Sequence, residues 1–117
     1  MSLVNWAEDI SYHHQFYALF SGSNIVRPPQ LPALNLTERC YDSLFQGCTN
    51  LMVPPQLPAT GLANGCYWEM FINCTSLSTV PNLPATELAP SCYYGMFAGC
   101  TSLTILPYYL LPATELK

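Results

Sequence analysis

Residues 57–81 read LPATGLANGCYWEMFINCTSLSTVP, and a variant copy of this stretch lies on each side of it. The upstream copy is LPALNLTERCYDSLFQGCTNLMVPP and the downstream copy is LPATELAPSCYYGMFAGCTSLTILP. The three copies begin at Leu31, Leu57 and Leu83, so the repeat is 26 residues long. A period of this length predicts a stacked solenoid, and it falls within the range of leucine-rich repeats.

Each copy divides into a proline-containing corner, a helical segment and a strand. The segment from Pro90 to Ala98 has its apolar side chains on one half of a helix surface, and Gly99 follows at a position favoured for a left-handed cap. Strands are predicted at 49–53, 75–79 and 101–105, and alternation directs six residues inward, namely Leu51, Val53, Leu77, Thr79, Leu103 and Ile105. We therefore expect an α/β repeat. It is a right-handed leucine-rich-repeat solenoid with short parallel strands on one face and short helices on the other.

The copies also define the organisation of the chain. We expect a capping segment at 1–18 and a solenoid at 19–117, with a degenerate repeat at 19–30, full repeats at 31–56, 57–82 and 83–110, and the start of a further repeat at 111–117. Trp6 to Leu19 is interpreted as an amphipathic helix that covers the first coil, and a small separate element is the alternative. At the other end we expect either a longer array or a coil that docks against another chain.

Charge and hydropathy exclude several classes of partner. The formal net charge is −4, and Arg27, Arg39 and Lys117 are the three cations. Nucleic acid and anionic membranes attract clustered Lys and Arg, so neither is expected as a partner. No apolar run approaches 18 residues, so we expect no membrane insertion, and residues 1–10 do not resemble a secretory signal.

The six cysteines permit several interpretations. The Cys-x7-Cys spacing of Cys40 and Cys48 is not that of a zinc site. Two ladders of buried thiols are favoured, with disulfides left open as the alternative. Both histidines, His13 and His14, lie near the N-terminus and away from every cysteine in the sequence. No catalytic constellation is apparent, so we expect no enzyme activity, no cofactor and no metal.

The run CYxxMFxxCTSLTxxPxLPAT, at residues 92–107 and 111–114, resembles the BspA-like bacterial leucine-rich-repeat surface proteins. The resemblance extends from Leu19 to Leu116. It implies a curved solenoid at the cell surface, or secreted, that acts in adhesion and binds host or microbial proteins or glycans without catalysis. Related repeats also occur in phages, so the alternative is a structural spacer or fibre component of a phage virion.

Two surfaces are candidates for binding. The exposed side of the predicted strands is the default, because solenoid curvature makes it concave. Its residues are Asn50, Met52, Ser76, Ser78, Ser102 and Thr104. Aromatic residues suit interface hot spots and sugar faces and form a secondary candidate, namely Trp68, Tyr94, Tyr108 and Tyr109. The expected partners are a protein or glycan ligand, or neighbouring subunits at the solenoid ends.

Overall fold

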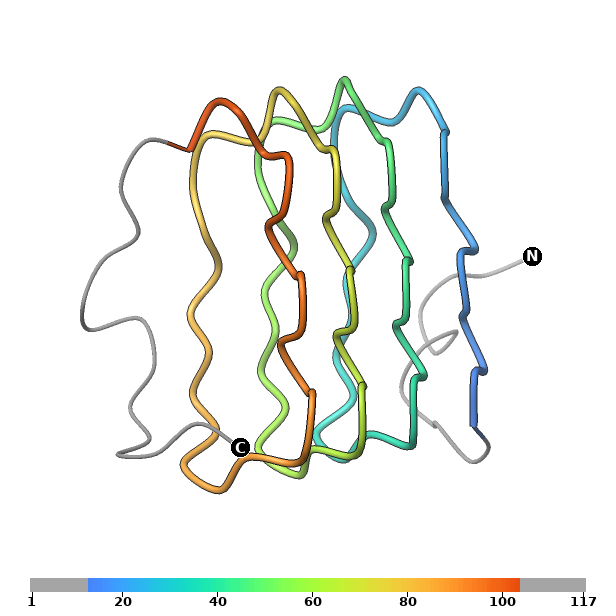
Figure 1. Cartoon of the computed structure of the whole chain (residues 1–117), viewed down its shortest axis with the longest axis vertical. Coiled ribbons are helices and arrows are strands. Elements are labelled where there is room, and N and C mark those ends of the chain that lie inside the picture. Colours follow the sequence, from blue (N-terminus) through green and yellow to red (C-terminus); the bar gives the residue numbers. More distant parts are fainter. Residues whose placement is uncertain (1–12, 104–117) are drawn as a thin grey trace.

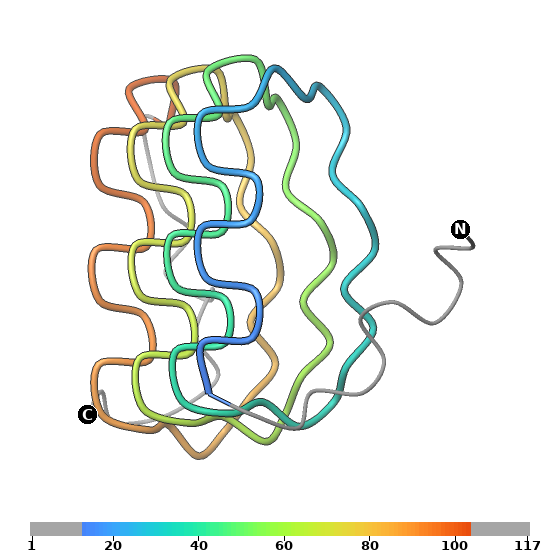
Figure 2. The same cartoon turned by 90° about the vertical axis from the view of Figure 1, so that its right-hand side faces the viewer.

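The computed structural model describes residues 13–103, which wind into stacked coils (Figure 1). Each coil crosses one face of the molecule as a zigzag segment and returns along the opposite face as a straighter segment. Figure 2 shows the zigzag segments side by side on one face, which we call the turn face, and the straighter ones on the other, the return face. The coils span residues 13–37, 38–63 and 64–89, followed by the described part of a fourth at 90–103.

The zigzag segments are runs of tight turns at 13–22, 38–47, 64–73 and 90–99. Every second residue donates its backbone N–H to the carbonyl three residues earlier, as Asp42 does to Arg39 at 3.1 Å. The residues between them donate to the next coil, as Tyr41 does to Cys66 at 3.0 Å. Five such inter-coil bonds of 2.7–3.1 Å join each neighbouring pair of turn segments. Local and inter-coil bonds therefore share the backbone donors equally.

The turns require a left-handed backbone at every fourth residue. In the second coil Arg39, Ser43 and Gly47 have φ between 52° and 68°. The residues that share this conformation across the coils are His14, Ala18, Gly22, Arg39, Ser43, Gly47, Gly65, Glu69, Asn73, Ser91, Gly95 and Gly99. A positive φ at the third residue of a turn defines type II geometry, so turns of this kind alternate with turns that lack it.

This four-residue repeat places side chains in pairs, two inward and then two outward. Tyr41 and Phe45 occupy inward positions, and each is at most 1% exposed. Rings from successive coils stack in two ladders with centroids 5.5–6.1 Å apart. One ladder is Phe16, Tyr41, Tyr67 and Tyr93, and the other is Phe20, Phe45, Phe71 and Phe97. The core is therefore a set of columns parallel to the stacking direction.

The secondary structure differs from the prediction, because residues 13–103 contain neither an α-helix nor a strand. Inward pairs repeating every four residues imitate the 3.6-residue period of a helix over a segment as short as 90–98. Among the predicted strand residues, Leu51 and Leu77 are fully buried as expected. Val53 and Thr79, predicted inward, are exposed instead. The predicted inward position at Ile105 lies outside the described residues.

The N-terminal boundary also differs from the prediction. Residues 13–18 belong to the first turn segment, since Phe16 and Ala18 donate to carbonyls of the second coil. The part of the predicted capping helix from residue 13 to Leu19 is therefore turn structure, and the rest lies outside the described residues. The first coil starts before the boundary at residue 19 that the repeat alignment gives.

The return face is held together more loosely. Its segments are extended, so Leu57 and Ala59 are buried while Pro58 between them is exposed. Among the described residues the one parallel bridge joins Asn35 to Gly61, with Leu36 donating to Gly61 at 2.8 Å. Proline has no backbone N–H to donate, which limits pairing between coils on this face.

Exchanging glycine and alanine at left-handed positions distinguishes turns from helices. We expect Gly47→Ala to destabilise the fold by about 1–2 kcal/mol, because an L-residue is disfavoured at its φ of 68°. Ala18→Gly should stabilise it by about 1 kcal/mol for the same reason at φ 52°. Urea unfolding of both variants is the measurement. A helix at residue 18 would reverse the second result, since glycine is the poorer helix former by about 1 kcal/mol.

Candidate binding site

The turn face carries a hollow of about 690 Å³ that crosses the first three coils. Its lining combines aromatic rings, both signs of charge and neutral hydrogen-bonding groups. The residues are His14, Tyr17, Arg39, Asp42, Ser43, Gln46, Trp68 and Glu69. All of them belong to turn segments, so the inter-coil hydrogen bonds fix the backbone beneath the hollow.

The hollow lies beside a column of outward side chains in which the residue of one coil differs in type from the others. In this outward column Tyr17, Trp68 and Tyr94 are aromatic, whereas the second coil carries Asp42. Where two aromatic residues are adjacent they contact each other, with the rings of Trp68 and Tyr94 4.1 Å apart. Asp42 is smaller than a ring, and the Arg39 guanidinium that pairs with it contacts the Trp68 ring at this position.

Asp42 is buried with both carboxylate oxygens engaged. It is 3% exposed, receives a hydrogen bond of 2.7 Å from the Ser43 hydroxyl and forms an ion pair of 3.0 Å with Arg39. Pairing and hydrogen bonding of this kind offset the desolvation cost of burying a charged group. The Arg39 guanidinium also lies 4.2 Å from the centroid of the Trp68 ring, in a cation–π contact. One arginine thus connects the carboxylate to the tryptophan.

A glycine in the next coil makes room for Arg39. A Cβ at residue 65 would approach the Arg39 Cγ to 3.1 Å and Nε to 3.4 Å, in addition to meeting the strain of a positive φ. Glu69 has the same relation to Gly95, where a Cβ would lie 3.1 Å from the Glu69 Cγ. Long side chains on the turn face therefore lie across a glycine of the following coil.

The residues of the default surface do not form a strand face. Met52, Ser78 and Ser102 are exposed, but Ser78 donates to the Met52 carbonyl and Ser102 to that of Thr75 at 2.7 Å. Those hydroxyls link neighbouring coils. Asn50 is exposed and Ser76 is half-buried, and Thr104 lies outside the described residues.

The secondary candidates divide into two groups. Trp68 and Tyr94 are brought together on the turn face, yet Trp68 is half-buried between Arg39 and Tyr94. Tyr94 remains 55% exposed. Tyr108 and Tyr109 lie outside the described residues. Sequence reasoning missed Tyr17, Arg39 and Asp42, although an aspartate in an otherwise aromatic column is a signal once the register is known.

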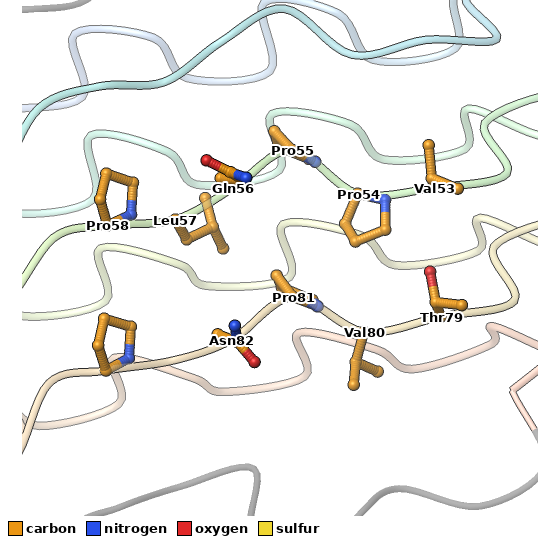
Figure 3. A pocket seen from close by; sticks show the side chains of 11 residues that line it. Val53, Pro54, Pro55, Gln56, Leu57, Pro58, Thr79, Val80, Pro81 and Asn82 are labelled. Atoms are coloured by element: carbon orange, nitrogen blue, oxygen red, sulfur yellow. The ribbon is translucent and has the colours of Figure 1, made fainter.

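The return face has a second hollow of about 560 Å³ between residues 53–58 and 79–84 (Figure 3). Prolines, aliphatic side chains and the amides of Gln56 and Asn82 line it. A similar hollow of about 450 Å³ lies one coil earlier, around Gln30. Neither hollow is lined by a charged side chain, so the return face offers less hydrogen-bonding specificity than the turn face.

All six cysteines lie within the described residues, and all are buried free thiols. Cys48, Cys74 and Cys100 each donate an S–H bond of 3.0 Å to a phenylalanine carbonyl of the preceding coil. Burial raises the pKa of Cys40 to about 11 and those of Cys66 and Cys74 to about 12. These thiols are protonated at neutral pH, which opposes a nucleophilic role because the thiolate is the reactive form.

Comparison with protein-family models, curated proteins and solved structures finds no match to this chain. Among residues 13–103, no group of three or more His, Cys, Asp or Glu side chains is placed to hold a metal ion. The described chain also forms no helix long and apolar enough to cross a membrane.

The buried thiols predict a loss of stability in alkali. Below the ordinary thiol pKa of 9.0 both folded and unfolded chains hold the proton, so stability is constant. Above it the unfolded thiols ionise first, and each thiol with a raised pKa costs about 1.4 kcal/mol of stability per pH unit until its folded pKa is reached. Urea midpoints between about pH 7 and about pH 10 measure this. Cys66→Ala should show a shallower decline, and an unchanged midpoint in the unmutated chain would contradict the prediction.

Proposed function

We propose that this chain is a non-catalytic binding module whose ligand occupies the turn-face hollow. One coil per 26-residue repeat supports relating it to BspA-like leucine-rich-repeat proteins, which implies an adhesive role at the cell surface or after secretion. In residues 13–103, turn segments stand where short helices were predicted for a leucine-rich repeat. The proposed binding surface lies on the turn face, because residues 13–103 form no strand face.

The observation that carries this proposal is the composition of the hollow. Tyr17 is 56% exposed at one side, and the Arg39–Trp68 pair stands at the other, above a buried carboxylate. Binding sites typically combine apolar walls with a few placed polar groups, and Tyr, Trp and Arg are enriched among residues that dominate binding energy. The protonated thiols and the fully engaged Asp42 favour recognition over catalysis.

Binding of the purified chain to immobilised extracellular-matrix proteins and mucin tests this proposal. We expect saturable binding to at least one of them, and a loss of about tenfold or more for Tyr17→Ala, as for a residue at the centre of an interface. Gln56→Ala on the return face is the matched control and should bind like the unmutated chain. If both variants lost binding equally, or if Tyr17→Ala bound like the unmutated chain, the ligand would lie elsewhere.

One further observation favours assembly as a second candidate function, as in a virion fibre. The N–H groups of alternate residues in the fourth turn segment point away from the third coil and donate to no described residue. They belong to Ser91, Tyr93, Gly95, Phe97 and Gly99. In each earlier coil the equivalent five groups bind a row of carbonyls, which a neighbouring subunit can supply.

Sedimentation velocity over a range of concentrations tests assembly. An edge that recruits subunits should give concentration-dependent association that Tyr94→Lys weakens, because a charge at a backbone edge opposes pairing. Gln30→Lys, on the return face of the first coil, is the control and should associate normally. A monomer at every concentration would count against this second function.

A further inference from the structure

We propose that copies of this chain join head to tail, with the fourth turn segment of one copy docked on the first turn segment of the next. This inference rests on assembly as the second proposed function, and it names the partner as a second copy of the chain. Segments 13–22 and 90–99 lie at opposite ends of the row of turn segments (Figure 2). Each therefore has one edge that faces no other turn segment of residues 13–103.

The two edges carry complementary backbone groups. Between neighbouring coils, N–H groups of one turn segment donate to carbonyls of the next, as Ala18 does to Asp42 at 2.9 Å. The same register places N–H groups of the fourth segment opposite carbonyls of the first segment of another copy. The pairs are Gly95 with Tyr17, Phe97 with Leu19 and Gly99 with Ser21. None of these three N–H groups and three carbonyls forms a backbone hydrogen bond within residues 13–103.

The same rows determine how the two copies are oriented. Two fourth segments placed edge to edge would set N–H groups against N–H groups, and two first segments would set carbonyls against carbonyls. Unlike edges alone pair donors with acceptors, so the contact is heterologous. A contact of this type generates a closed ring or an open filament and not a two-fold dimer.

Apolar side chains at the two ends suit the same contact. The inner rungs of the phenylalanine ladder are 0% exposed, whereas Phe20 and Phe97 at its ends are half-buried. Leu19 is 53% exposed, although its equivalent in the second coil, Leu44, is fully buried. Stacking of a fourth segment on a first segment would remove these apolar surfaces from water, which favours association.

The distribution of charged residues also permits pairing at the ends. Segments 38–47 and 64–73 carry Glu38, Arg39, Asp42 and Glu69, whereas 13–22 and 90–99 contain no Lys, Arg, Asp or Glu. Natural proteins commonly protect an exposed backbone edge from association with charged side chains, lysine above all. Neither end segment has this protection, so neither carries a lysine, arginine or carboxylate that would oppose docking.

Two end variants and their mixture test the inference by sedimentation velocity. Leu19→Lys places a charge on the first segment, and Tyr94→Lys places one on the fourth. We expect the unmutated chain to form species larger than a dimer as its concentration rises. Each variant alone should associate about tenfold more weakly or less, because a charge at a backbone edge opposes pairing. An equimolar mixture should form a heterodimer through its two unmodified edges and grow no further.

The matched control is Leu34→Lys, which makes the same exchange at a side chain that is 58% exposed on the return face. It should associate like the unmutated chain. Circular dichroism establishes that each variant is folded. If Leu19→Lys failed to fold, Ser21→Lys would decide, since the equivalent positions of the next two coils accept the long side chains of Gln46 and Ile72.

The outcomes separate the head-to-tail contact from assembly in general. If Tyr94→Lys weakened association and the first-segment variant did not, the chain would still assemble, but the first segment would not be the partner edge. A dimer that grows no further in the unmutated chain, or a mixture that forms no heterodimer, would also overturn the inference. A monomer at every concentration would remove assembly and the head-to-tail contact together.

Discussion

The structure depends on the division of backbone donors between local turns and the next coil. Within the middle turn segments, alternate N–H groups close turns and the others bind carbonyls of the following coil. A helix would direct all of these donors along its own axis and leave neighbouring coils joined by side chains alone. Here the backbone itself sets the distance and the register between coils, so each residue stands next to its equivalent one coil away.

Because equivalent residues of successive coils stand next to each other, the repeat in the sequence produces columns of similar side chains. Phenylalanine and tyrosine rings stack face to face, with Phe71 and Phe97 only 1° from parallel. The carbonyl of Phe45 accepts two donors, the N–H of Cys48 and the thiol of Cys74 from the next coil. A slip of two residues would exchange inward and outward positions and break both arrangements at once. This explains why cysteine, small and weakly donating, recurs beside phenylalanine.

The sequence allowed the coil length and most of the inward residues to be predicted, because the 26-residue spacing of equivalent residues does not depend on the local backbone conformation. It did not reveal the turns. Two inward pairs and a cap glycine fit a helix as well as a four-residue repeat, and left-handed residues such as Arg39 and Glu69 carry no signature of their conformation. For the site, Trp68 and Tyr94 were predicted, but Asp42 was not. Tyr17 precedes Asp42 by 25 residues and not by the 26 of the repeat, which obscured their alignment.

The hollow illustrates how a repeat protein gains a specific site without a new element of structure. A ladder repeats the same contact, so a uniform column offers a ligand nothing that distinguishes one coil from the next. Replacing one ring by aspartate removes a rung, and the buried charge then requires Arg39 and Ser43 as partners. Arg39 in turn requires the space that Gly65 leaves in the following coil. A single departure from the repeat thus accounts for the buried ion pair on the turn face.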